Sequence, residues 1–78
     1  MMTDQNSAQT RMNERYRQFM DPLLAHAERD VRLARADGDA QAAARAQARL
    51  ATLQTALAIY AAAHLHGHGE RPWPRERP

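Results

Sequence analysis

The chain has 78 residues, no cysteine and a formal net charge of +2, and it contains only three glycines and four aromatic residues. These values exclude disulfide staples and thiolate metal sites, and they argue against an all-β fold. A domain of this size buries little apolar surface, so we expect it to gain stability by association with another chain.

All eleven basic residues are arginine, and seventeen residues are alanine. This bias is typical of GC-rich coding sequences, and we expect a bacterial protein or one encoded by a phage or plasmid. The chain contains no run of about 18 apolar residues, the length that a membrane span requires. Its N-terminus lacks the charged and then apolar pattern of a secretion signal. The sequence therefore predicts a cytoplasmic protein without a membrane segment.

The first helix is predicted from about residue 10 to residue 36. Residues 1–8 are polar without a period, which predicts a disordered arm. From residue 9 or 10 onward the apolar residues fall on one broad face. Pro22 interrupts this pattern, since proline lacks an N–H and disfavours helical geometry at Asp21. Either one helix is kinked near Pro22 or two helices meet there, and the unbroken phase of the apolar face favours the kinked helix.

The second helix is predicted over residues 39–66. It contains no Gly or Pro, Asp39 is a suitable N-cap, and Gly67 is a suitable stop. Its apolar residues are separated by alternating steps of three and four, which is the spacing of a coiled-coil seam. They are Ala43, Ala46, Leu50, Leu53, Leu57, Tyr60 and His64.

The turn at residues 37–39 is so short that the two helices must be antiparallel neighbours. Residue i of the first helix then faces about residue 76 − i of the second. The facing pairs become Leu23 with Leu53, Phe19 with Leu57, Tyr16 with Tyr60, and Met12 with His64. Arg49 with Glu28 and Arg45 with Asp30 would flank the seam. The predicted core of the hairpin is Leu23, Leu24, Ala27, Val31, Leu50, Leu53, Leu57 and Tyr60.

Each helix also carries apolar residues outside the seam. On the first helix they form a second stripe, and on the second helix they include Ile59 and Leu65. Exposed stripes of this kind require a partner, and a second copy is the simplest one. We therefore predict an all-α fold: an antiparallel helical hairpin, kinked or broken near Pro22, that pairs into a dimeric four-helix bundle.

Residues 67–78 are rich in Pro and Arg and predict an extended tail. Trp73 lies between two prolines in this tail. It has two interpretations: an exposed anchor for another protein, since Trp and Arg are enriched in interface hot spots, or a residue that packs on its own helices.

Three histidines alternate at the end of the second helix: His64, His66 and His68. Imidazoles bind zinc, nickel or copper, but helical residues two apart point to different faces. We therefore expect structural roles and no cofactor, and keep these three as weak metal candidates. His26 is likewise interpreted as a structural or surface residue, because no nucleophile or orienting carboxylate forms a constellation with it.

No phosphate-binding loop, nucleophile motif or catalytic carboxylate pair is visible, which predicts a protein that is not an enzyme. The hypothesis is a small regulator, inhibitor or adaptor that forms a homodimer and binds a larger protein by helix packing. The residues predicted to contact that protein are Met12, Tyr16, Phe19, Met20 and Trp73.

Two alternatives from other functional classes remain. A dimer could bind nucleic acid through arginine patches near Arg15 and Arg32, although interleaved acidic residues cancel most of their charge. The C-terminal histidines could instead form a metal-responsive module.

Overall fold

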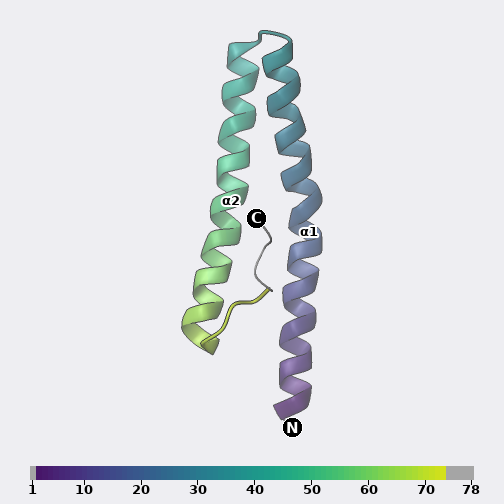
Figure 1. Cartoon of the computed structure of the whole chain (residues 1–78), viewed down its shortest axis with the longest axis vertical. Helices are drawn as coiled ribbons and strands as arrows, with labels where there is room; N and C mark the ends of the chain where they lie inside the picture. The colour runs from purple at the N-terminus through teal and green to yellow at the C-terminus, as the bar shows by residue number, and fades with distance from the viewer. Residues whose placement is uncertain (1, 74–78) are drawn as a thin grey trace.

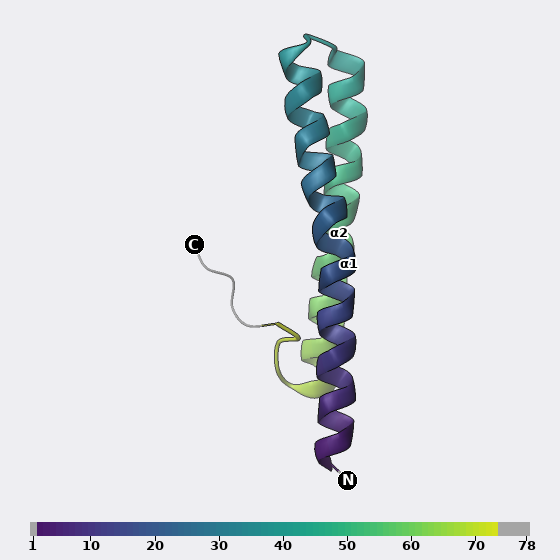
Figure 2. The same cartoon turned by 90° about the vertical axis from the view of Figure 1, so that its right-hand side faces the viewer.

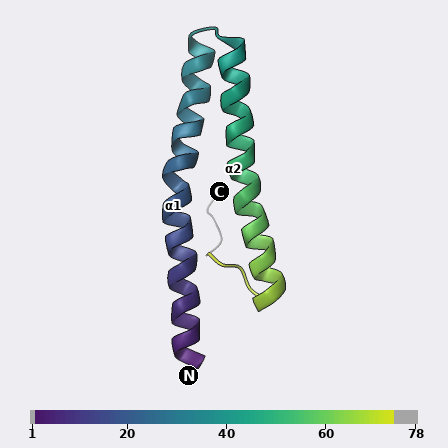
Figure 3. The same ribbon diagram turned by 180° about the vertical axis from the view of Figure 1, so that it is seen from behind.

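The computed structural model describes residues 2–73, with side chains from residue 8 onward. Two helices, α1 (Met2–Ala36) and α2 (Ala40–His68), lie side by side and antiparallel (Figure 1). They form a thin rod of 56 × 21 × 19 Å, and the same pairing is seen from behind (Figure 3). The prediction of an all-α helical hairpin is confirmed for the described residues.

Helix α1 is longer than the sequence predicted. It begins at Met2, where a disordered arm was expected over residues 1–8, and it runs through Pro22 as one element. The alternative of two separate helices is therefore wrong, while a kink at Pro22 stays a prediction. Pro22 is exposed, and residues on either side of it, Met20 and Ala27, are buried against α2. Packing on both sides offsets the backbone hydrogen bond that proline removes.

The turn is held by backbone hydrogen bonds. The Gly38 amide donates to Arg35 O at 3.1 Å and the Asp39 amide donates to Ala34 O at 3.0 Å. Gly38 has φ +73°, a conformation that glycine adopts without steric cost. Asp39 is the N-cap of α2, as its position in the sequence predicted, and its carboxylate accepts from Ala42 N at 3.0 Å. These bonds satisfy groups that helix ends leave unpaired.

Helix α2 ends two residues later than predicted. Gly67 remains helical, and Gly69 takes the left-handed conformation (φ 77°) and donates its N–H to Leu65 O. In the additional turn, the His64 and His68 rings lie 4.5 Å from each other.

The core is a single narrow seam between the helices. Ala27, Val31 and Leu50 form its buried centre, with three half-buried residues packed against them: Leu24, Ala46 and Leu53. Of the predicted core, Leu24, Ala27, Val31, Leu50 and Leu53 lie in this seam, whereas Leu23 is 39% exposed. Helix α1 carries two adjacent apolar stripes, and α2 packs on the one that includes Leu24.

Because α2 packs on this stripe, α1 is rotated about its axis relative to the predicted pairing, and the contacts at the free ends of the helices also change. Tyr16 faces Tyr60 as predicted, with ring centroids 4.1 Å apart. Met12 and Phe19 are instead 61% and 68% exposed, and Asn13 takes the place predicted for Met12 opposite His64. Flanking the seam, Arg49 pairs with Asp30 at 3.6 Å, rather than with Glu28.

Neither α1 nor α2 contains, within the described residues, a segment with the length and apolar character needed to cross a lipid bilayer.

The narrow core makes stability depend on few side chains. Replacing buried Leu50 with Ala should lower the free energy of unfolding by about 2 kcal/mol or more, because a cavity opens at the centre of the seam. Urea denaturation followed by circular dichroism measures this change. Leu65→Ala is the control, with an expected loss of about 0.5 kcal/mol or less because Leu65 is exposed. Equal losses in the two variants would contradict the assigned core.

Candidate functional site

The two helices diverge toward their free ends, and the chain after α2 turns back toward the space between them (Figure 1). Five side chains meet in this region. We call them the Asn13 cluster: Asn13, Tyr16, Tyr60, His64 and Trp73.

Asn13 is the polar centre of this cluster, and only 4% of it is exposed. Its Oδ1 accepts from the Tyr60 hydroxyl at 2.6 Å and from Gln9 Nε2 at 3.3 Å. Its Nδ2 lies 3.1 Å from His64 Nε2. An amide side chain inserted in an apolar seam is stable only when its donors and acceptors are paired. Asn13 therefore ties α1 to α2 through two directional hydrogen bonds.

His64 connects the cluster to the tail. Its Nδ1 lies 2.8 Å from Glu70 O, and a carbonyl can only accept, so Nδ1 carries the proton. Nε2 is then the acceptor for the Asn13 amide in the neutral imidazole. With this assignment, no buried side-chain nitrogen or oxygen among the described residues lacks a partner.

Three aromatic rings fill the space beside Asn13. Tyr16 stacks on Tyr60, and the Trp73 ring lies 5.3 Å from that of Tyr60, nearly parallel to it. Trp73 Nε1 donates to the backbone oxygen of Asn13 at 2.7 Å. The Arg17 guanidinium lies 5.3 Å from the centre of the Trp73 ring, which is a cation–π distance. The tail is thus anchored to both helices by one side chain.

The phenol of Tyr60 has a perturbed acidity. Burial raises the pKa of Tyr60 above its ordinary value, and the neighbouring Tyr16 raises this pKa further through charge repulsion. The neutral hydroxyl is the form that donates to Asn13.

The five residues predicted to contact another protein do not form one surface. Met12 and Phe19 are exposed, whereas Met20 is buried in the seam and not accessible to a partner. Tyr16 and Trp73 are half-buried in the Asn13 cluster. Trp73 packs on its own helices, which is the second of its two interpretations.

Among the weak metal candidates, the structure brings His64 and His68 together and leaves His66 exposed. Both ring nitrogens of His64 already lie at hydrogen-bond distance from other groups. Within the described part of the chain, no group of three or more His, Cys, Asp or Glu side chains could hold a metal ion. His26 is exposed, with Nδ1 at 3.4 Å from Arg29 Nη2.

Sequence reasoning missed Asn13, although a signal was present. Asn13 continues the buried stripe of α1 at heptad spacing with Met20, Ala27 and Ala34. A polar residue in an apolar stripe indicates a paired contact, and the expected antiparallel register places it close to His64.

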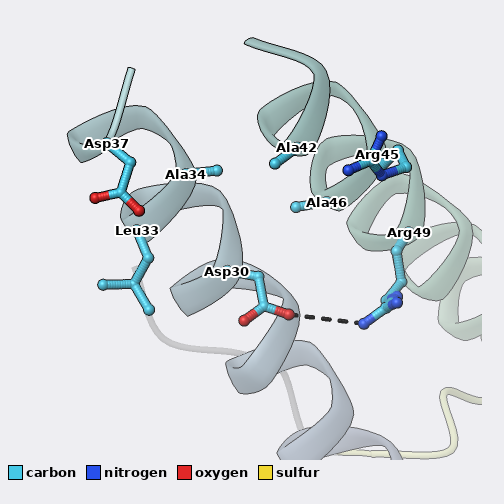
Figure 4. Close-up of a pocket in the computed structure, with 8 residues that line it drawn as sticks. All are labelled: Asp30, Leu33, Ala34, Asp37, Ala42, Arg45, Ala46 and Arg49. Atoms are coloured by element: carbon cyan, nitrogen blue, oxygen red, sulfur yellow. Dashed lines mark ion pairs between the residues drawn. The ribbon is translucent and has the colours of Figure 1, made fainter. Parts of the chain in front are cut away.

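A second surface of interest is an exposed face that both helices share. Asp30 of α1 and Arg49 of α2 form an ion pair there (Figure 4). Residues close to a whole number of helical turns from either of them point to the same side, as Met12 does, which lies about five full turns before Asp30. We call this surface the Asp30 face; its members are Met12, Phe19, Leu23, Asp30, Leu33, Arg45, Arg49, Thr52, Ala56, Ile59 and Ala63.

The Asp30 face changes in character along the rod. Near the turn it forms an open depression with an alanine floor and a charged rim that includes Asp30, Arg45 and Arg49 (Figure 4). Near the free ends it is apolar, since Phe19 and Ile59 are 68% and 64% exposed. The tail as far as Trp73 lies on one side of the hairpin (Figure 2). Arg17, which contacts Trp73, points about 140° away from Met12 around α1, so the tail as far as Trp73 lies off the Asp30 face.

In comparisons with known proteins, the chain matches no family model, no curated protein and no solved structure.

The hydrogen bonds of Asn13 predict a loss of stability when its amide is removed. Asn13→Ala should lower the free energy of unfolding by about 1–3 kcal/mol, because the buried His64 Nε2 loses its donor. Urea denaturation measures this loss, and Gln18→Ala, at an exposed site on the same helix, should change stability by about 0.5 kcal/mol or less. An Asn13→Ala protein as stable as the wild type would contradict the assigned bonds.

The raised pKa of Tyr60 predicts a loss of stability in alkali. Its contribution is fully present below the ordinary tyrosine pKa of 10.0, and it is lost as the pH rises through the higher pKa of the folded state. Urea midpoints measured from pH 8 to pH 12 should therefore fall less steeply for Tyr60→Phe than for the wild type. Tyr16→Phe is the control and should retain most of the fall, since burial is the larger cause of the shift.

Proposed function

We propose that the protein is a non-enzymatic regulator, inhibitor or adaptor that binds proteins by helix packing, and that it works as a dimeric four-helix bundle. The observation that supports this proposal is the Asp30 face. Large apolar side chains lie on it at heptad spacing and are more than half exposed: Met12, Phe19, Leu33 and Ile59. Large apolar side chains that gather on one exposed face are typical of an interaction site.

The size of the face fits a stable interface. The buried apolar residues of one hairpin are few and mostly small: Met20, Ala27, Val31, Ala34 and Leu50. The rod presents a side of 56 by 21 Å, on the order of 1,000 Å². This area is large enough for a standard interface, which buries roughly 800 Å² per partner. A second hairpin packed on this face would supply the apolar burial that a single hairpin lacks.

Charge and size favour one arrangement of the two copies. If the two-fold axis runs parallel to the rod, α1 of each copy lies antiparallel to α2 of the other, in the register already used within the hairpin. Phe19 of one copy then meets Ile59 and the small Ala56 of the other. Asp30 of one copy also meets Arg45 and Arg49 of the other, which gives opposite charges at the turn end.

Binding to a larger protein would use the same chemistry. Helix-on-helix packing requires exposed apolar residues three, four and seven apart, and α1 offers Met12, Phe19 and Leu23 at the free end. The two alternatives have less support. Arg17 and Arg49 are paired with Asp21 and Asp30, which reduces the positive charge available for nucleic acid. The two ring nitrogens of His64 are engaged within the fold, which disfavours a metal-responsive role.

The dimer is tested by sedimentation equilibrium of the purified chain. We expect twice the chain mass of 8.8 kDa at micromolar concentration. Phe19→Glu and Ile59→Glu together place like charges on the Asp30 face and should weaken self-association at least about 100-fold. Leu65→Glu is the control, because Leu65 is exposed on another side of α2 and should leave the dimer intact. A monomeric wild type, or an equal effect of the control, would contradict the proposed bundle.

The same three proteins serve as bait in a pull-down from nuclease-treated lysate. The function predicts a larger protein that the wild type and Leu65→Glu retain and that the double variant loses. A captured partner that disappears with nuclease would instead support the nucleic-acid alternative. Circular dichroism shows whether all three baits remain helical.

A further inference from the structure

The Trp73 side chain occupies a slot between the helices, on the side away from the Asp30 face. One wall of the slot is formed by stacked Tyr16 and Tyr60. Its polar end is the backbone oxygen of Asn13, which accepts the indole N–H at 2.7 Å. Arg17 covers the ring with its guanidinium, 5.3 Å from the ring centre. This set of contacts matches an indole in particular: a flat face, an N–H donor and an electron-rich ring.

The walls of the slot are built without the tail. The Tyr16–Tyr60 stack and the hydrogen bond from the Tyr60 hydroxyl to Asn13 Oδ1 join α1 to α2. The contact between Asn13 Nδ2 and His64 Nε2 does the same. Each of these contacts is made by helical residues alone. If Trp73 leaves, its neighbours retain partners that fix their positions, so the slot is preformed.

The tail, in contrast, follows the C-cap Gly69 and belongs to neither helix. It reaches the slot within four residues, and Trp73 remains half-buried. The Glu70 carbonyl contacts His64 Nδ1 at 2.8 Å, and the next tail residue, Arg71, is exposed. The chain bends at Pro72 and Trp73. Pro72 fixes its own φ and restricts the backbone of Arg71, so little conformational entropy is lost when such a segment docks. Apart from the Glu70 contact, the described tail is held on the helices by the side chain of Trp73.

We propose that this slot is a docking site for a proline-flanked tryptophan segment of another protein, and that the chain's own tail is its resident occupant. The tail is an internal competitor, and a partner segment of the same chemistry displaces it. This site lies on the opposite side from the Asp30 face, so its occupancy does not require the proposed dimer.

The tether sets the scale of the competition. A flexible link of a few residues gives an effective concentration of about 1 mM or more. A docked tail requires a dissociation constant below this effective concentration. A free peptide that carries the tail sequence should therefore bind an emptied slot with a dissociation constant of about 0.1 mM or less, and it should compete poorly with the attached tail.

The test uses the full chain with Trp73→Ala, which empties the slot. The probe is a peptide of residues 69–78 in which tryptophan is replaced by 5-fluorotryptophan, and its fluorine NMR signal is followed as protein is added. We expect saturable binding to Trp73→Ala and at least about tenfold weaker binding to the wild type. Adding Arg17→Gln to Trp73→Ala should weaken binding several-fold, whereas Arg15→Gln, at an exposed site on the same helix, should not.

Three results would overturn the proposal. The first is no probe binding by a Trp73→Ala chain that remains helical by circular dichroism. The second is a Trp73→Ala chain that loses its helices, because the proposal requires walls that stand without the tail. The third is displacement of the probe by intact wild-type chain as effectively as by free peptide. In that case the tail of a second copy would be the natural occupant. The dimer can fail its own test without affecting any of these results.

Discussion

Two helices alone can share only one line of contact, and the whole structure depends on this constraint. Each helix buries one stripe of side chains against the other, so the enclosed core is small, with Ala27, Val31 and Leu50 at its centre. The remaining sides of the rod must be solvated, covered by other parts of the chain or covered by another molecule. The tail covers one side through Trp73, and the Asp30 face on another side is left exposed.

The Asn13 cluster gives the apolar seam a fixed register. Apolar contacts between heptad stripes are not directional, and small shifts along the helices cost little. The hydrogen bonds of Asn13 with Tyr60 and His64 require one relative position of α1 and α2. Because these groups are buried, a shift would leave them unpaired at a cost of about 1–3 kcal/mol each. The cluster therefore specifies how α1 and α2 are aligned at their free ends, where no pair of large aliphatic side chains meets in the seam.

The two candidate surfaces differ in chemistry, which is consistent with separate roles. The Asp30 face is long, mostly apolar toward the free ends and charged near the turn, as expected for helix packing. The slot of Trp73 is small and built from aromatic rings, one carbonyl and one guanidinium, as expected for a single aromatic anchor. In our proposals the first surface sets the assembly, and the second regulates access by a tryptophan-containing peptide.

The sequence by itself determined the hairpin. The uninterrupted helix formers of α2, the cap at Asp39 and the glycine of the turn depend on local backbone chemistry, which is readable one segment at a time. Only the tertiary structure decided which of the two stripes of α1 faces α2. The two stripes have the same period, and they differ only by a rotation about the helix axis. That rotation buried Asn13 and exposed Met12, Phe19 and Leu23. It also fixed the place of Trp73, since a tail without periodicity is positioned by the slot that the folded helices create.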